Sequence, residues 1–80
     1  MNAEKLITMA NQIGEFFAAM PDRKQAAEDI FGHLRRMWEP RMRRNLYAYI
    51  DAHGTSGLAD IVKEVVVSRR RELEPPAAKQ

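Results

Sequence analysis

Apolar side chains recur every three or four residues through the first twenty positions of the chain. At 100° per residue they fall on one arc of about 120°, with polar residues on the other side. Asn2 precedes this pattern as a suitable N-cap, and Pro21 ends it. The pattern predicts an amphipathic helix over residues 2–20, whose core-facing side consists of Leu6, Met9, Ala10, Ile13, Phe16, Phe17 and Met20.

Two further helices are predicted downstream, each bounded by residues that start or stop helices. Asp22 is an expected N-cap for a helix over residues 23–38, with Gln25 completing a capping box. Pro40 disfavours helical geometry at the preceding residue and starts a third helix over residues 40–53. Gly54 supplies the left-handed stop. The inward residues of these helices are Ala26, Ala27, Ile30, Phe31, Leu34, Met37 and Trp38, then Met42, Leu46, Tyr49 and Ile50.

A fourth helix is predicted over residues 57–71, capped by Ser56. Leu58, Ile61, Val62, Val65 and Val66 form one stripe along it. The β-branched run 65–67 leaves a strand open as an alternative, but no other strand exists to pair with it. Residues 74–80 show no periodicity and predict a flexible tail. The fold class is therefore all-α: a small bundle of about four helices in one domain, residues 1–73.

Size and charge indicate a small protein that needs a partner. A chain of 80 residues buries only about 60% of the surface that its unfolded form exposes, and without cysteine it forms no disulfide. The net charge is only +2. The N-terminus does not resemble a signal peptide, and no segment approaches the roughly 20 apolar residues that cross a bilayer. We expect a soluble, cytoplasmic protein that does not contact a membrane.

Residues 33–46 carry the strongest functional signal. They contain five arginines, the only tryptophan and one glutamate. Arginine binds carboxylates and phosphates bidentately, and arginine and tryptophan dominate the energetics of interfaces. Positive charge at the start of the third helix opposes the helix dipole by about 0.3–1 kcal/mol per exposed charge, so an external anion is expected. The predicted partner-binding residues are Arg35, Arg36, Trp38, Glu39, Arg41, Arg43, Arg44 and Tyr47.

Each candidate also has a purely structural interpretation. Arg35 and Arg36 end a helix, where positive charge is favourable, and the other arginines can simply be solvated. Trp38 can be a core residue or an interface hot spot. Tyr47 points away from its apolar neighbours on the helical wheel, which predicts an exposed aromatic side chain; Ile7 and Val67 also lie off their stripes. The run 69–71 ends a helix and needs no functional explanation.

Two segments of the chain resemble a known family. Met9–Phe17 (MANQIGEFF) and His33–Arg44 (HLRRMWEPRMRR), with Pro21, Leu46, Asp51 and Gly54, are similar to the delta subunit of the bacterial NAD-dependent, molybdenum-containing formate dehydrogenase. The resemblance covers roughly residues 6–66. Residues 65–67 and the tail add nothing to it.

The resemblance implies a non-catalytic accessory subunit that assembles or stabilises the enzyme complex and has no cofactor of its own. The alpha subunit, which carries bis-molybdopterin guanine dinucleotide and iron–sulfur clusters, is the expected partner. Beta and gamma subunits with FMN and further clusters complete the complex. A transient maturation factor that helps to insert or retain the molybdenum cofactor is the alternative.

Other function classes are less well supported by the residues. The low net charge and the lack of a helix-turn-helix motif argue against nucleic-acid binding. Asp51 and His53 do not have the spacing of a complete metal site. Thr55 and Ser56 lie beside His53, but no orienting acid supports nucleophilic catalysis. We therefore expect no enzyme active site.

Overall fold

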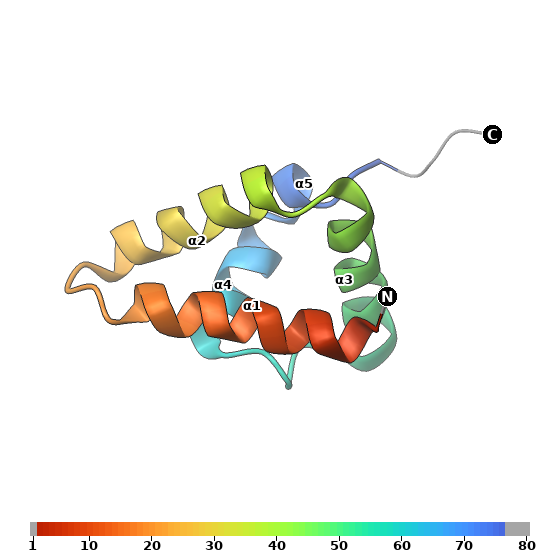
Figure 1. The fold of residues 1–80 in the computed structure, drawn as a ribbon, viewed down its shortest axis with the longest axis horizontal. Coiled ribbons are helices and arrows are strands. Elements are labelled where there is room, and N and C mark those ends of the chain that lie inside the picture. Colours follow the sequence, from red (N-terminus) through yellow and green to blue (C-terminus); the bar gives the residue numbers. More distant parts are fainter. Residues whose placement is uncertain (1, 77–80) are drawn as a thin grey trace.

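The computed structural model describes residues 2–76 and shows five helices, with no strand among these residues. They are α1 (Ala3–Ala18), α2 (Arg23–Met37), α3 (Pro40–His53), α4 (Asp60–Ser68) and α5 (Arg70–Leu73). Figure 1 shows α1 and α2 as a long hairpin whose open end is closed by α3, with α4 and α5 behind it. The all-α prediction is confirmed, and helices form where four were expected.

The first three helices have the predicted starts and stops to within two residues. The Asn2 side chain accepts a hydrogen bond from the backbone N–H of Glu4 at 2.8 Å, and Asp22 accepts from Lys24 and Gln25 at 3.0 and 3.2 Å. The Gln25 side chain donates to Asp29 instead of returning to Asp22, so the capping box is not reciprocal. Gly54 ends α3 with φ at 82°.

The predicted fourth helix begins later than expected and is broken in two. Its N-cap is Ala59, not Ser56. Asn11 of α1 holds the preceding loop, because its side chain donates to the Gly57 carbonyl at 2.9 Å and accepts from the Ala59 N–H at 2.8 Å. Arg69, at φ −110° and ψ 23°, separates α4 from α5. Residues 65–67 are helical, so the alternative of a strand there is wrong.

The core lies between the α1–α2 hairpin and α4, with α3 closing one end. Gly14 lets α1 approach α4, because a Cβ there would collide with the side chain of Val62. Ile7 was expected off the apolar stripe, yet it is buried and contacts the loop near Gly57. The fully buried side chains of largest volume are Tyr47, Leu6, Ile30, Leu34, Leu46, Leu73, Val62, Val65 and Val66.

The predicted tail, residues 74–80, is described only in part. Glu74, the first residue of the predicted tail, accepts a hydrogen bond from Arg70 Nε at 2.6 Å, while residues 77–80 of that tail lie outside the described residues. Among the described helices, none combines the length and the apolar character needed to cross a bilayer.

Candidate functional site

The connection between α2 and α3 gathers the predicted basic surface. Four arginines are exposed there, two near the end of α2 and two in the first turns of α3; we call them the corner arginines: Arg35, Arg36, Arg41 and Arg44. None of the four makes an ion pair with another residue in the range 2–76. Glu39, the N-cap of α3, is exposed and makes no side-chain cap. The corner therefore offers uncompensated positive charge to solvent.

Arg43 belongs to the same sequence cluster but is buried, with 7% of its surface exposed. Its Nη1 donates to the Leu73 carbonyl at 2.6 Å and its Nε donates to the Trp38 carbonyl at 3.2 Å. These carbonyls end α5 and α2, where backbone oxygens lack helical partners and favour a cation. Burial, followed by repulsion from Arg35, lowers the pKa of Arg43. Arg43 thus joins three helices and is not part of an exposed docking surface.

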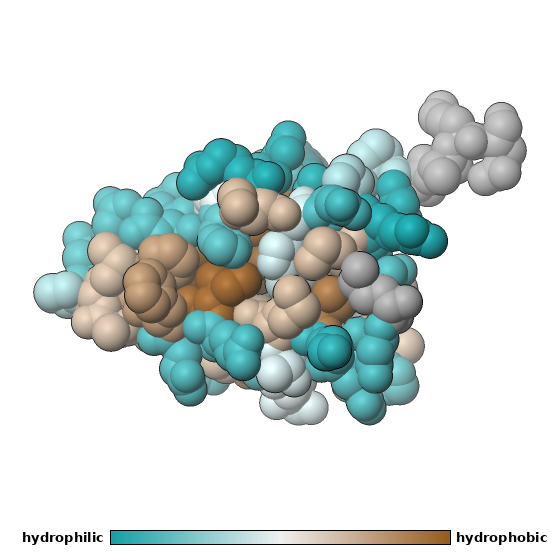
Figure 2. Space-filling model, viewed as in Figure 1, coloured by the Kyte–Doolittle hydropathy of each residue, from teal (hydrophilic) through white to brown (hydrophobic). Residues whose placement is uncertain are grey.

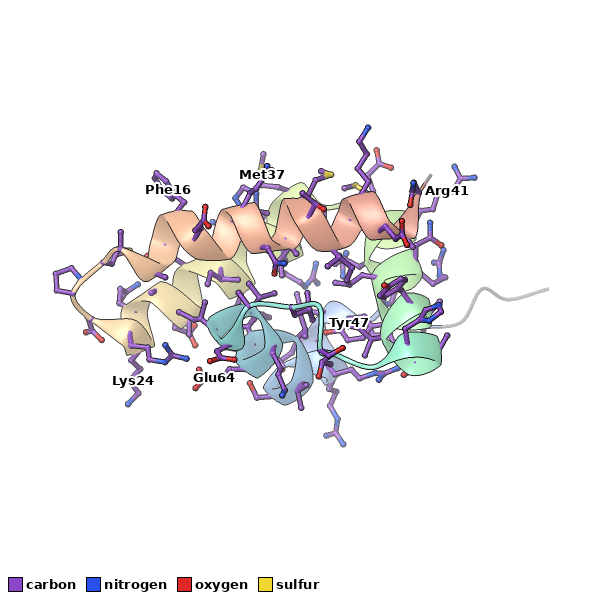
Figure 3. The ribbon with its side chains drawn as sticks, turned by 90° about the horizontal axis from the view of Figure 1, so that it is seen from below. Phe16, Lys24, Met37, Arg41, Tyr47 and Glu64 are labelled. Carbon is purple, nitrogen blue, oxygen red and sulfur yellow. The ribbon has the colours of Figure 1, made fainter. Side chains whose placement is uncertain are left out.

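Tyr47 was predicted to be an exposed aromatic residue, and this is wrong: its side chain is 1% exposed and lies within the fold (Figure 3). The hydroxyl donates to the Val66 carbonyl at 2.8 Å, in the last turn of α4. Burial raises the pKa of this phenol. The wheel misplaced Tyr47 because it considered only the apolar residues of α3, whereas the chain returns through α4 and α5 to cover a second side of that helix.

Of the two interpretations of Trp38, core residue or exposed interface residue, the structure supports the core residue. It is buried at 4% exposure and forms the C-cap of α2. Trp38 is nevertheless one of the residues that line a surface groove between α1 and α2. It is a core residue beside that groove and not an exposed anchor in the described structure.

The second basic run, residues 69–71, contributes more to the fold than its sequence position suggested. Arg69 pairs with Glu28 at 2.7 Å and Glu72 at 3.1 Å, and its guanidinium lies 3.7 Å from the centre of the Phe31 ring. Burial is the largest single influence on the pKa of Arg69 and lowers it. The hydrogen bond to Glu72 and the attraction by Glu28 together outweigh burial, so the pKa is raised.

Arg70 makes a matching set of contacts on α3. It binds Asp51 bidentately at 2.9 and 2.8 Å, binds Glu74 at 2.6 Å, and lies 4.7 Å above the Tyr47 ring. The hydrogen bond from Arg70 lowers the pKa of Asp51. Glu72 and Glu74, three and four residues from the two arginines, were the sequence signal for local pairing; the contacts with Glu28 and Asp51 required the fold.

An apolar groove between α1 and α2 was not predicted. Its volume is about 410 Å³, and its lining consists of Met9, Gln12, Ile13, Phe16, Phe17, His33 and Trp38. Phe16 and Met37 were assigned to the core, but they are 74% and 66% exposed, and Met9 is 36% exposed. None of the described helices covers the outer face of the α1–α2 hairpin, so these side chains are exposed within residues 2–76. We call this surface the α1–α2 groove.

Each of the two histidines has an aromatic neighbour among the described residues. His33 lies 6.4 Å from Phe17 and His53 lies 4.5 Å from Tyr49, measured between ring centres. Asp51 is engaged by Arg70. No group of three or more potential metal ligands occurs in the part of the chain that the structure describes.

The chain matches one protein family over a range that includes the corner arginines. The model of the NADH-dependent formate dehydrogenase delta subunit family, FdsD, matches residues 5–66, which run from α1 into α4. No curated protein and no solved structure matches the chain. The matched range includes the α1–α2 groove and the four corner arginines.

Proposed function

Because the chain belongs to the NADH-dependent formate dehydrogenase delta subunit family, we propose that it is a non-catalytic accessory subunit that assembles or stabilises this complex. It docks on a larger subunit through the corner arginines. The alpha subunit is the partner, in a cytoplasmic assembly that also holds beta and gamma subunits. Bis-molybdopterin guanine dinucleotide, iron–sulfur clusters and FMN belong to the larger subunits in this proposal.

Docking is supported by the corner arginines, which carry positive charge that no acid within residues 2–76 neutralises through an ion pair. Arg41 and Arg44 occupy the first turns of α3, where the helix dipole repels cations, and no acid lies in the first turn to offset them. An arrangement that disfavours the isolated chain becomes favourable when carboxylates of a partner reach the guanidinium groups. The same guanidinium groups would also speed the encounter with an acidic surface.

The remaining reactive side chains support a structural role. Asp51 is bound by Arg70, and Arg43 and Tyr47 are used to bond the ends of neighbouring helices. These groups hold the fold together and present no free acid, base or nucleophile at a shared point. A scaffold that positions a docking surface is the function they fit.

The alternative function, a transient maturation factor, is less well supported by the same surface. It would place cofactor phosphates at the start of α3, where backbone N–H groups bind anions. That site is impaired here, because Pro40 at the first position has no N–H and the exposed carboxylate of Glu39 precedes it. Carboxylates of a protein partner, which can approach Arg41 and Arg44 from the side, suit this corner better.

Copurification tests the proposal. The tagged full-length chain is expressed with the alpha, beta and gamma subunits and purified at low salt and at about 1 M salt, where the screening length falls to roughly 3 Å. We expect stoichiometric recovery of the complex at both salt concentrations, because ion pairs that docking buries are screened much less than exposed ones. Release of the chain from cofactor-loaded enzyme, with retention on cofactor-free alpha subunit, would favour the maturation factor. No recovery at either salt would contradict both.

A further inference from the structure

The α1–α2 groove leaves large apolar side chains in solvent on one face of the molecule. Met9, Ile13 and Phe16 follow one another along α1 at spacings of four and three residues, so they form a continuous ridge about 10 Å long. Met37 adds exposed apolar surface from α2. Figure 2 shows brown and tan side chains gathered between α1 and α2, with hydrophilic residues on both sides. Exposed apolar surface of this continuity is characteristic of an interaction site.

Positive charge borders this apolar surface. Phe16, Met37 and Arg41 all project from the same side of the molecule, whereas Lys24 and Glu64 project from the opposite side (Figure 3). The Arg36 guanidinium folds back over Gly32, since a Cβ at Gly32 would lie 2.9 Å from Arg36 Nη1. Arg36 follows His33 by three residues, a spacing that makes their side chains neighbours on α2, and His33 lines the groove. Arg36 therefore borders the groove and Arg41 projects from the same side of the molecule, and neither makes an ion pair within residues 2–76.

The chemistry of the lining selects the secondary structure of the occupant. Only two of the seven lining residues, Gln12 and His33, have polar side chains, and the described chain offers no sheet edge. An extended segment would bring backbone N–H and C=O groups that find no partners there. A helix satisfies its own backbone and can lay an apolar stripe into a groove between two helices.

We propose that the α1–α2 groove receives one amphipathic helix of the larger formate dehydrogenase subunit, with apolar side chains seated between α1 and α2 and carboxylates facing Arg36 and Arg41. This inference rests on the proposed function and deepens it. The interface then has two parts. Contacts with the apolar ridge supply most of the binding energy, and ion pairs with Arg36 and Arg41 fix the orientation of the bound helix.

Alanine substitutions measure the contribution of the groove. The chain carrying Phe16→Ala and Met37→Ala is titrated into the formate dehydrogenase assembly expressed without it, and the dissociation constant is compared with that of the wild type. We expect binding to weaken about 10- to 100-fold, as for loss of buried interface anchors. Both residues are exposed in helices, and alanine favours helix, so the variant keeps its fold.

Val67→Ala is the matched control, because Val67 is 59% exposed on α4, three residues from Glu64 on the opposite side. We expect its dissociation constant to stay within about twofold of the wild type. If wild type binds and the alanine pair binds equally well, the groove inference is wrong while the proposed function stands. If wild type does not bind, the proposed function itself fails.

Photocrosslinking identifies the occupant. Benzoylphenylalanine at position 16, in the coexpressed complex, should crosslink to one helical segment of the larger subunit that carries at least two acidic residues beside an apolar stripe. The same probe at position 67 should not crosslink to that segment. A crosslink from position 16 to a second copy of this chain, to its own residues 77–80, or to an extended or basic segment would contradict the inference.

Discussion

The corner arginines and the C-terminal pair, Arg69 and Arg70, both belong to arginine clusters in the sequence but have opposite environments in the structure. Each member of the C-terminal pair binds two carboxylates and lies over an aromatic ring. The corner arginines bind no carboxylate within residues 2–76. Arginine density alone therefore does not indicate function; what separates the two groups is whether the fold supplies acids to them.

The difference has a simple origin in the placement of acids. Glu72 and Glu74 follow Arg69 and Arg70 at helical spacing, and packing of α5 against α2 and α3 adds Glu28 and Asp51. Around the corner, residues 33–46 provide only Glu39. The C-terminal pair is satisfied when the chain folds, whereas the corner arginines pair with no acid in residues 2–76, and the docking proposal rests on that difference.

Arg43 shows that an arginine within the residue 33–46 cluster need not be exposed or available to a partner. It lies one position from Arg44, yet it is buried and bonds two helix-terminal carbonyls. Arg43 therefore has no place in a test of docking, because its loss acts on folding.

The largest effect is expected for Arg43→Met, which keeps the apolar stem and removes both hydrogen bonds to the Trp38 and Leu73 carbonyls. Each hydrogen bond to a charged group contributes about 1.5–3 kcal/mol, but the substitution also removes the cost of burying a cation. The free energy of unfolding should therefore fall by about 2–4 kcal/mol, less than the sum of the two bonds. Urea denaturation followed by circular dichroism measures it. Arg44→Met, at an exposed neighbour, should change stability by less than about 0.5 kcal/mol. Equal effects of the two substitutions would contradict the division of the cluster.

Tyr47→Phe should give the next largest loss. The ring stays in the core, and only the hydroxyl bond to the Val66 carbonyl disappears, which costs about 0.5–1.5 kcal/mol. Tyr49→Phe is the control, since Tyr49 is half-buried and its hydroxyl makes no hydrogen bond among those described. If the two variants are equally stable, Tyr47 does not cap α4 as the structure indicates.

Neutralising the corner should act in the opposite direction. Arg41→Gln with Arg44→Gln removes two cations from the positive end of the α3 dipole, so the isolated chain should gain about 0.5 kcal/mol of stability. Thermal unfolding at low salt measures the gain, and added salt should reduce it. A loss of stability would mean that these arginines have internal partners and belong with the C-terminal group.

The smallest effect concerns pH and the Arg70–Asp51 pair. The hydrogen bond from Arg70 lowers the pKa of Asp51 below its ordinary 3.8, so the folded state binds this proton less readily than the unfolded state. The stability that the pair contributes is present above about pH 3.8 and is lost as the pH falls through the lower folded value. Asp51→Asn should therefore be less stable than wild type near pH 6 and equal to it in strong acid. A difference independent of pH would contradict the ionic role of Asp51.

Sequence patterns were sufficient for the helices and much of the core, because amphipathic spacing and caps such as Asn2, Asp22, Pro40 and Gly54 act locally. They failed where a distant segment decides burial. Phe16 and Met37 lie on apolar stripes, but none of the described helices covers them, whereas Tyr47 lies off its stripe and is covered by α4 and α5. The break at Arg69 likewise coincides with contacts to Glu28 and Phe31 of α2, which no local pattern contains.

The affinity of the Arg41→Glu, Arg44→Glu variant for the formate dehydrogenase assembly expressed without this chain tests the central claim most directly. Lys24→Glu with Lys63→Glu, the same change in net charge at exposed sites away from the corner, is its matched control. We predict that the corner variant binds at least about tenfold more weakly, while it is no less stable than wild type and the control binds within about twofold. Wild-type affinity in the corner variant would contradict the claim that the unpaired arginines hold an anionic partner.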